Sequence, residues 1–338
     1  MSERKFQSAA AKRSKVPLLI GIAGPSGGGK TFSALRLAKG IQTVTGGDIH
    51  FIDTENGRAC HYADQFNFKH VAFDPPYNPL SYLSAIEYCC DQGPGPIVVD
   101  STSHEHDGEG GVLDMHDTEV QRMAGGDWQK AERVKMLAWV KPKAERRKLL
   151  NAIVRLNRNI IFCFRAKPKL KVQKGKDPIQ LGYMPIAGDE FVFEMTVSAL
   201  LMPNAGGVPS WNPHEDGEKQ MVKLPFQFRD MLLNHEGPLN ESLGQRMAEW
   251  AAGVDPVEIN LRKIVAAASL DELAAAWKSI PGPIQVKLAA SKDRRKVELS
   301  KQPDPEPESE YEPDPDKPPP RKQRSFAESE ADTAALSK

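Results

Sequence analysis

A glycine-rich segment at residues 24–31, Gly-Pro-Ser-Gly-Gly-Gly-Lys-Thr, most constrains what this chain can fold into. It matches the G-x-x-x-x-G-K-[ST] pattern at every fixed position, follows an apolar run at residues 16–23 and precedes a helical pattern at residues 32–41. In such a strand–loop–helix, backbone N–H groups surround phosphate oxygens, and the helix N-terminus adds partial positive charge. A glycine-rich turn that matches by chance is the alternative, and it does not explain the flanking strand and helix patterns. The segment therefore predicts nucleotide binding.

The last two residues of the segment have specific expected roles. Lys30 would reach the β- and γ-phosphates, and Thr31 would place its hydroxyl on Mg²⁺. ATP and Mg²⁺ are therefore the predicted cofactors. The residues expected to contact the nucleotide are Gly24, Pro25, Ser26, Gly27, Gly28, Gly29, Lys30, Thr31 and Phe32.

Two later apolar runs end in acidic residues. Asp100 follows Ile97–Val99, and an acid there would support Mg²⁺; an ordinary turn aspartate after a buried strand is the alternative. Glu55 closes the run at residues 48–56, and it could orient and deprotonate the attacking water, because the carboxyl ends of parallel strands converge. Ser101 follows Asp100, so the base must come from elsewhere. The predicted catalytic residues are Glu55, Lys30 and Asp100.

The order of these motifs resembles that of the RecA-like recombinase ATPases. The motifs are the segments at 24–31, 51–56 and 97–101, followed by a polar strand end after 159–164. The resemblance implies that Glu55 is the catalytic base and that Asp100 supports Mg²⁺. The family also places a polar γ-phosphate sensor after the next strand, commonly glutamine, and this sequence has Arg165 there. The implied fold is an α/β, RecA-like P-loop core with a mainly parallel sheet flanked by helices.

Residues 100–117 and 139–162 look like those of compact phage-encoded members of this group, which are reduced to the ATPase core and act in single-strand annealing and recombination. Composition and apolar spacing, together with the resemblance for the core, divide the chain into four expected regions. They are a flexible basic arm at 1–15, a RecA-like ATPase core at 16–253, a small helical module at 254–300, and a disordered acidic, proline-rich tail at 301–338. The helical module is expected either to dock protein or DNA or to pack on the core.

A basic segment follows the strand at 159–164. It carries six bases and no acid within residues 165–176: Arg165, Lys167, Lys169, Lys171, Lys174 and Lys176. In an extended chain, alternate lysines lie about 6.6–6.8 Å apart on one face, close to the spacing of phosphates along a nucleic-acid strand. A solvated lysine loop is the alternative. Because the corresponding loop of RecA-like proteins binds single-stranded DNA, these six residues are the predicted DNA contacts.

Two other polar groupings are candidate sites. His104 and His106 have a spacing that could ligate a metal, but apart from His116 no cysteine or histidine follows at a ligand spacing, so no histidine-held metal is predicted. A solvent-facing loop, which could sense the γ-phosphate, is favoured instead. Arg146, Arg147 and Arg155 are expected to project from the helix at 141–158, either as arginine fingers toward a neighbouring subunit or as a solvated face.

Composition narrows the partners only a little. The chain of 338 residues has 45 basic and 45 acidic side chains, so it has no global field that favours nucleic acid or membrane. Its four cysteines lack C-x-x-C spacing, and no run approaches the ~20 apolar residues of a membrane span. We expect a cytoplasmic protein, in the host cytoplasm if phage-encoded, without a membrane partner.

The leading expectation is a phage-type DNA recombination ATPase. It would bind single-stranded DNA, assemble as a ring or filament, promote annealing or pairing of strands, and cooperate with a single-strand binding protein or other recombination factors. One alternative is a phage replication ATPase, such as a helicase or helicase loader. Another is a nucleotide-switched recruitment protein with negligible turnover.

Overall fold

The structure is a computed structural model that describes residue 8, residues 16–171 and residues 177–301. It divides into two compact units, with the boundary between Ile259 and Asn260. Nearly all of the predicted basic arm and acidic tail lies outside the described residues.

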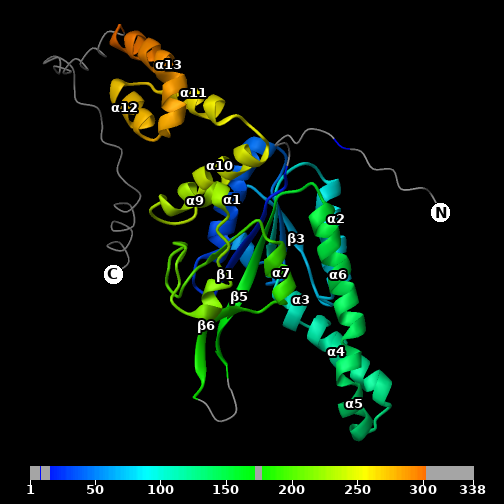
Figure 1. The fold of residues 1–338 in the computed structure, drawn as a ribbon. Coiled ribbons are helices and arrows are strands. Elements are labelled where there is room, and N and C mark those ends of the chain that lie inside the picture. The colour runs from blue at the N-terminus through cyan, green and yellow to red at the C-terminus, as the bar shows by residue number, and fades with distance from the viewer. Residues whose placement is uncertain (1–7, 9–15, 172–176, 302–338) are drawn as a thin grey trace, which may run out of the picture. The chain divides into compact units, whose positions relative to one another are not determined.

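The first unit is built on a seven-stranded sheet (Figure 1). Its strands are β1 (Leu19–Gly24), β2 (His50–Asp53), β3 (Lys69–Ala72), β4 (Ile97–Asp100), β5 (Ile160–Lys171), β6 (Ile179–Pro185) and β7 (Val197–Leu200). The spatial order is β3-β2-β4-β5-β1-β7, and all these pairs are parallel; β6 pairs with β5 in the antiparallel sense. The predicted mainly parallel α/β sheet is confirmed at this level.

The central strands are apolar on both faces, as expected where helices cover both sides of a parallel sheet. Along β5, Ile161 and Cys163 belong to one hydrophobic cluster, while Ile160, Phe162 and Phe164 belong to the other. The strand period of two therefore distributes one continuous apolar run between two cores.

Helices from distant parts of the chain supply those two cores (Figure 1). One cluster includes residues of α1 (Lys30–Thr45), α9 (Phe226–Leu233) and α10 (Glu241–Ala251); the other includes residues of α2 (Pro79–Asp91), α6 (Val140–Arg155) and α7 (Asp189–Glu194). Short elements complete this unit: η1 (Arg58–Tyr62), α3 (His104–Asp107) and α8 (Asp216–Lys219).

Glycine allows α1 and α10 to pack closely. A Cβ on Gly40 would lie 1.9 Å from the Glu241 carbonyl oxygen, and one on Gly244 would lie 2.2 Å from that of Leu37. Arg36 adds an ion pair to Glu241 across the same crossing, at 2.8 Å. This packing fixes α1, and therefore the loop that precedes it, against the sheet.

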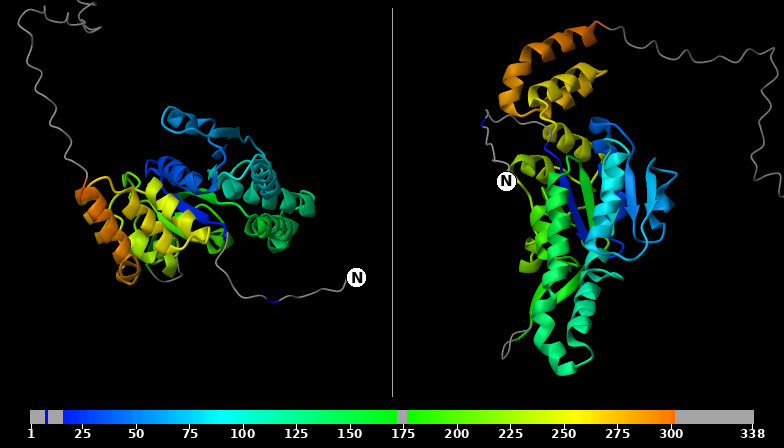
Figure 2. Two further views of the ribbon diagram at one scale, coloured as in Figure 1. Left: turned by 90° about the horizontal axis from the view of Figure 1, so that it is seen from above. Right: turned by 90° about the vertical axis from the view of Figure 1, so that its right-hand side faces the viewer.

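Two projections extend past the sheet at the carboxyl ends of its strands (Figure 1; Figure 2, right). One is the antiparallel β5–β6 hairpin. The other contains α4 (Val112–Ala124) and α5 (Trp128–Ala138), which pack against each other and against α6. The sequence predicted an extended basic segment for the first projection, but not the helical pair.

Two stretches differ from what their sequence patterns predict. The apolar stretch at 192–202 has the pattern of one strand, but its start belongs to α7, which turns Phe191 and Val192 into the core before β7 begins. The stretch at 207–225 has the pattern of a hairpin, but it makes only isolated bridges to β7, Ser198 with Lys223 and Leu200 with Ser210, and contains α8.

The second unit is helical. Its elements are α11 (Pro256–Ala266), which spans the boundary, α12 (Leu270–Lys278) and α13 (Gly282–Ser300). Ser269 caps α12 by accepting a hydrogen bond from the Glu272 N–H at 3.1 Å, the usual role of serine before the first turn of a helix. Leu273, Ile280 and Leu288 are buried. In the part of the chain that the structure describes, no helix has both the length and the apolar character of a bilayer span.

Candidate nucleotide-binding and catalytic site

The glycine-rich loop joins β1 directly to α1. Gly27 and Gly29 have φ values of 79° and 90°, a left-handed conformation that side-chain-bearing residues rarely adopt. A Cβ on Gly29 would also lie 2.8 Å from the Gly207 nitrogen. Lys30, at the start of α1, donates from Nζ to the Pro25 carbonyl at 2.9 Å, so its ammonium lies over the loop. This geometry is what a phosphate cradle requires.

The sheet register brings the predicted acids to this loop. Gly24 is paired with Arg165, Cys163 with Asp100, and Asp100 with Asp53 on successive neighbouring strands. Because β5 lies between β1 and β4, the end of β5 lies between the glycine-rich loop after β1 and the acidic ends of β4 and β2. The polar ends of four strands therefore meet at one edge of the sheet.

Thr31 and Asp100 are in direct contact. The Thr31 hydroxyl donates to Asp100 Oδ2 at 2.6 Å. Burial raises the Asp100 pKa to about 6, against the opposing hydrogen bond from Thr31, and the nearby charge of Glu55 adds to the increase. The two residues predicted to support Mg²⁺ thus form one preorganised oxygen pair, and a bound cation would stabilise the ionised form of its buried carboxyl.

The turn after β2 positions Glu55. Asp53 accepts a hydrogen bond from the Glu55 N–H on Oδ1 at 2.6 Å and one from the Ala59 N–H on Oδ2 at 3.2 Å, and His70 Nε2 lies 3.1 Å from the same Oδ2. Asn56 and Gly57 both have positive φ values, 55° and 79°, which reverse the chain. Buried Asp53 is therefore a structural anchor, and the side chain of Glu55 faces the loop.

Two arginines hold the Glu55 carboxylate. Arg165 donates from Nε and Nη2 to Oε1 at 3.0 and 2.8 Å, while Arg58 donates from Nη1 to Oε2 at 3.1 Å. Burial alone would raise the Glu55 pKa, but the hydrogen bonds and charge of Arg165, with the charge of Arg58, hold it below its ordinary value. Glu55 is ionised and doubly paired at neutral pH.

His104 and His106 point to different partners. His104 Nδ1 lies 2.7 Å from Thr54 Oγ1, and its ring stacks on Tyr77; burial, then the charge of Arg165, lower its pKa, so it is neutral at pH 7. His106 Nδ1 lies 3.0 Å from Arg146 Nη2. Among the described residues, no group of three or more His, Cys, Asp or Glu side chains could hold a metal ion. Mg²⁺ between Thr31, Asp100 and phosphates would not require such a group.

Arg146 does not project from its helix as predicted. It is buried and pairs with Glu105 through Nε at 3.0 Å and Nη2 at 2.7 Å. The arginine can be buried because two parallel hydrogen bonds join it to Glu105 and because the opposite charges of the two side chains compensate each other. Arg147 and Arg155 are exposed, as expected.

The site residues surround one cavity of about 740 Å³. Its lining includes Lys30, Thr31, Glu55, Asp100 and Arg165. Sequence reasoning missed Arg58, His61, Tyr62, Ala166 and Ile186, which also line it. The Asn-Gly dipeptide at 56–57 was the available signal, because it predicts a turn that returns the following residues toward the site.

Of the nine predicted nucleotide contacts, Gly24, Pro25, Gly28 and Phe32 do not line this cavity. Phe32 packs in an aromatic cluster instead. Its ring packs on Tyr62 and Phe66, with centroids 5.5 and 5.4 Å away, and it is not part of the cavity lining. Phe32 therefore packs against Tyr62, which lines the cavity, without lining the cavity itself.

The predicted DNA-contact residues fall into three groups. Lys167 and Lys169 are exposed on β5, opposite Met184 and Gly182 of β6. The backbone of Lys171 ends the strand, while Lys174 and Lys176 lie outside the described residues. Arg165 lines the cavity of about 740 Å³ and pairs with Glu55.

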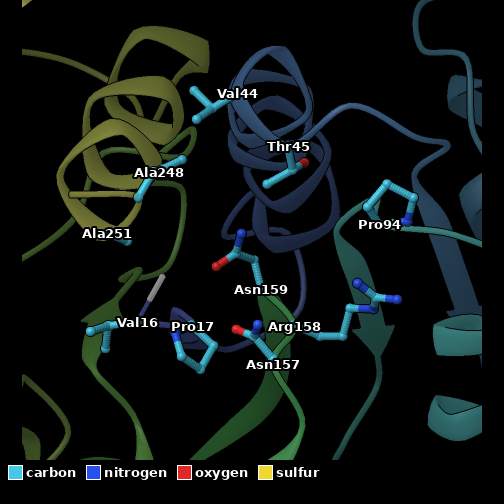
Figure 3. Close-up of a pocket in the computed structure, with 11 residues that line it drawn as sticks. Val16, Pro17, Val44, Thr45, Pro94, Asn157, Arg158, Asn159, Ala248 and Ala251 are labelled. Atoms are coloured by element: carbon cyan, nitrogen blue, oxygen red, sulfur yellow. The ribbon is translucent and has the colours of Figure 1, made fainter. Parts of the chain in front are cut away.

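A smaller cavity of about 270 Å³ lies at the opposite, amino-terminal ends of β1 and β5 (Figure 3). Pro17, Val44 and Ala248 contribute apolar surface, and Arg158 is the only charged residue of the eleven that line it. Arg158 donates from Nη2 to the Cys90 carbonyl at 2.9 Å, and its buried Nε has no hydrogen-bond partner among the described residues. The lining holds no acidic residue, so this cavity has no counterpart to Glu55 or Asp100.

Comparison with protein-family models and with curated proteins found no match to this chain. The assignment of a function therefore rests on the geometry of the site.

Proposed function

We propose that this protein is an ATPase that binds single-stranded DNA and uses the state of its nucleotide to control the annealing or pairing of strands. One observation carries the proposal: Lys30, the Thr31–Asp100 pair and Glu55 line the same cavity at the end of the glycine-rich loop. These groups supply phosphate binding, metal support and a carboxylate base, the three parts that phosphoryl transfer to water requires.

The residues divide the chemistry between them. The loop N–H groups and Lys30 would bind the phosphates, and Thr31 and Asp100 would hold Mg²⁺, which neutralises charge that develops on the phosphate oxygens. Glu55 would orient a water molecule and accept its proton. Tyr62 and Ile186 offer apolar surface in the same cavity for the remainder of the nucleotide.

The nucleic-acid part of the proposal rests on the β5–β6 hairpin. Lys167 and Lys169 are exposed on a strand that extends past the sheet, and no hydrogen bond or ion pair of either side chain occurs among the described residues. Unpaired ammonium groups along an extended protein backbone can bind the phosphates of a nucleic-acid strand whatever its base sequence. The resemblance to RecA-like proteins supports the same assignment, together with a homo-oligomer and a role in phage-type recombination.

Neutralising Lys167 and Lys169 as a glutamine pair should weaken binding of a labelled ~50-nucleotide single strand and reduce its salt dependence. Each lost phosphate contact lowers the slope of log K against log[salt] by about 0.7 for a single strand, so a reduction of about 1.4 is expected. Fluorescence anisotropy between ~50 and ~200 mM salt measures both quantities. The matched control is Lys39→Gln with Lys69→Gln, two exposed lysines on α1 and β3. Equal slopes for the two double variants would remove the hairpin from the proposal.

A nucleotide-switched recruitment protein is the second candidate, and one observation favours it. Both oxygens of Glu55 are engaged by arginines, an arrangement that slows proton transfer to the carboxylate. Slow turnover without a partner fits both candidates, whereas accelerated turnover on DNA fits only the ATPase.

A further inference from the structure

Arg165 occupies the junction between two parts of the first unit. It is the last β5 residue paired with β1, and the next residue, Ala166, is the first paired with β6. Its N–H donates to Ser103 Oγ at 2.8 Å, and its carbonyl accepts from the Ile186 N–H at 2.7 Å. The backbone of Arg165 therefore belongs to the root of the β5–β6 hairpin, while its guanidinium belongs to the catalytic site.

The hairpin root is also a wall of the nucleotide cavity. Ala166 and Ile186, which flank the root on β5 and just beyond β6, both line that cavity. Lys167, the next residue along β5, is exposed. Burial and then the charge of Arg146 lower the His106 pKa, and the charge of Lys167 adds a smaller contribution in the same direction. A strand held by Lys167 and Lys169 would therefore act on the chain directly beside Arg165.

The contact between Arg165 and Glu55 is suited to being broken. Both nitrogens of Arg165 bind the same oxygen, so the pair lacks the two parallel bonds of a bidentate fork. The Arg165 side chain is 42% exposed, whereas the bidentate Arg146 is 8% exposed in its pair with Glu105. Arg58 binds the other oxygen, but it lies on η1, three residues from Glu55, and among the described residues no hydrogen bond or ion pair joins it to the hairpin.

We propose that Arg165 is a positioning residue that restrains Glu55 until the β5–β6 hairpin binds a single-stranded nucleic acid. Strand binding draws Arg165 away, frees Oε1 for the attacking water and starts hydrolysis. This inference rests on the proposed function and adds to it the physical link between its two sites.

The first test is steady-state ATP hydrolysis by Arg165→Gln with and without a saturating ~50-nucleotide single strand. Loss of the restraint should raise the DNA-free rate at least fivefold and bring the ratio of stimulated to DNA-free rate close to one. Arg58→Gln is the matched control, because it removes a guanidinium from the same carboxylate without touching the hairpin; its ratio should remain that of the unaltered protein. Arg165→Lys keeps a cation near Glu55 and should restore a low DNA-free rate.

The pH profile separates restraint from a structural role. Without Arg165 the Glu55 pKa rises, so the acid limb of the DNA-free rate should move to higher pH in Arg165→Gln. If the substitution only destabilised the fold around the site, the hydrolysis rate would fall at every pH and the acid limb would stay at its original pH. An unmoved limb, or a lower DNA-free rate with the stimulation ratio intact, would overturn the inference.

Strand affinity supplies a test that does not depend on hydrolysis. If Arg165 contacted DNA, Arg165→Gln would weaken binding and reduce the salt slope by about 0.7. A positioning residue predicts an unchanged slope and equal or tighter binding, because the pair no longer has to break. If the unaltered protein neither binds a strand nor hydrolyses ATP, the proposed function itself fails; if it does both and Arg165→Gln keeps full stimulation, only this inference fails.

Discussion

Replacing Asp100 with asparagine should make the folded protein more stable while it abolishes Mg²⁺-dependent hydrolysis. Asp100 is 5% exposed, and burial raises its pKa from an ordinary 3.8 to about 6. A carboxyl whose folded pKa is raised favours folding below pH 4 and loses that contribution as the pH rises through 6. At neutral pH the shift corresponds to a cost of up to about 3 kcal/mol.

Asparagine removes this cost and still presents an oxygen to the Thr31 hydroxyl. Urea unfolding without Mg²⁺ or nucleotide should show a larger stability gain at pH 8 than at pH 5, where the native carboxyl is already mostly protonated. Asp91→Asn, the same change at an exposed position at the end of α2, should shift stability by less than about 0.5 kcal/mol at both pH values. A gain for Asp100→Asn that does not depend on pH would contradict the burial argument.

The same variant should lose hydrolysis by at least ~100-fold, because the neutral amide no longer supports the cation that offsets phosphate charge. Stability and activity would therefore move in opposite directions on one substitution. This is the pattern expected where a strained, charged site is maintained for function. Retained hydrolysis in Asp100→Asn would remove Asp100 from the site.

Replacing Glu55 with glutamine should preserve ATP binding and reduce hydrolysis by ~10²–10⁴-fold, the range expected for loss of a general base. Glutamine keeps the size of the side chain and an oxygen that can accept from Arg165, so the turn anchored by Asp53 should persist. A fluorescent ATP analogue measures binding, and single-turnover hydrolysis measures chemistry. Glu109→Gln, at an exposed position in the polar loop, is the control.

This substitution also separates the two candidate functions. An ATPase loses its activity with Glu55, whereas a pure nucleotide switch has little use for a positioned base. Hydrolysis that survives in Glu55→Gln at the original rate would show that another group activates the water.

The sequence predicted those parts of the site that are encoded by short, continuous patterns. The glycine-rich loop, the apolar run before Asp100 and the one before Glu55 are each local, and parallel strands bring their carboxyl ends to one edge. The sheet and the helix at 141–158 followed from apolar periodicity for the same reason.

Long-range pairings could not be predicted. Arg165 lies 110 residues from Glu55, and only the position of β5 between β1 and β4 brings them together. Arg165 therefore looked like the first residue of a basic loop. Arg146 looked exposed because its helix stripe is charged, while its partner Glu105 lies 41 residues earlier on a separate short helix. In both cases the position of the arginine side chain depends on a carboxylate partner that is distant in the sequence, and the charge of the arginine alone does not reveal that partner.

The most direct test of the central claim is ATP hydrolysis with and without a ~50-nucleotide single strand, a length that exceeds several sites of ~4–16 nucleotides, with duplex DNA of equal length as control. The account predicts stimulation by the single strand that disappears in Lys30→Ala and weakens when Lys167 and Lys169 are neutralised. Hydrolysis that is indifferent to any DNA would contradict it.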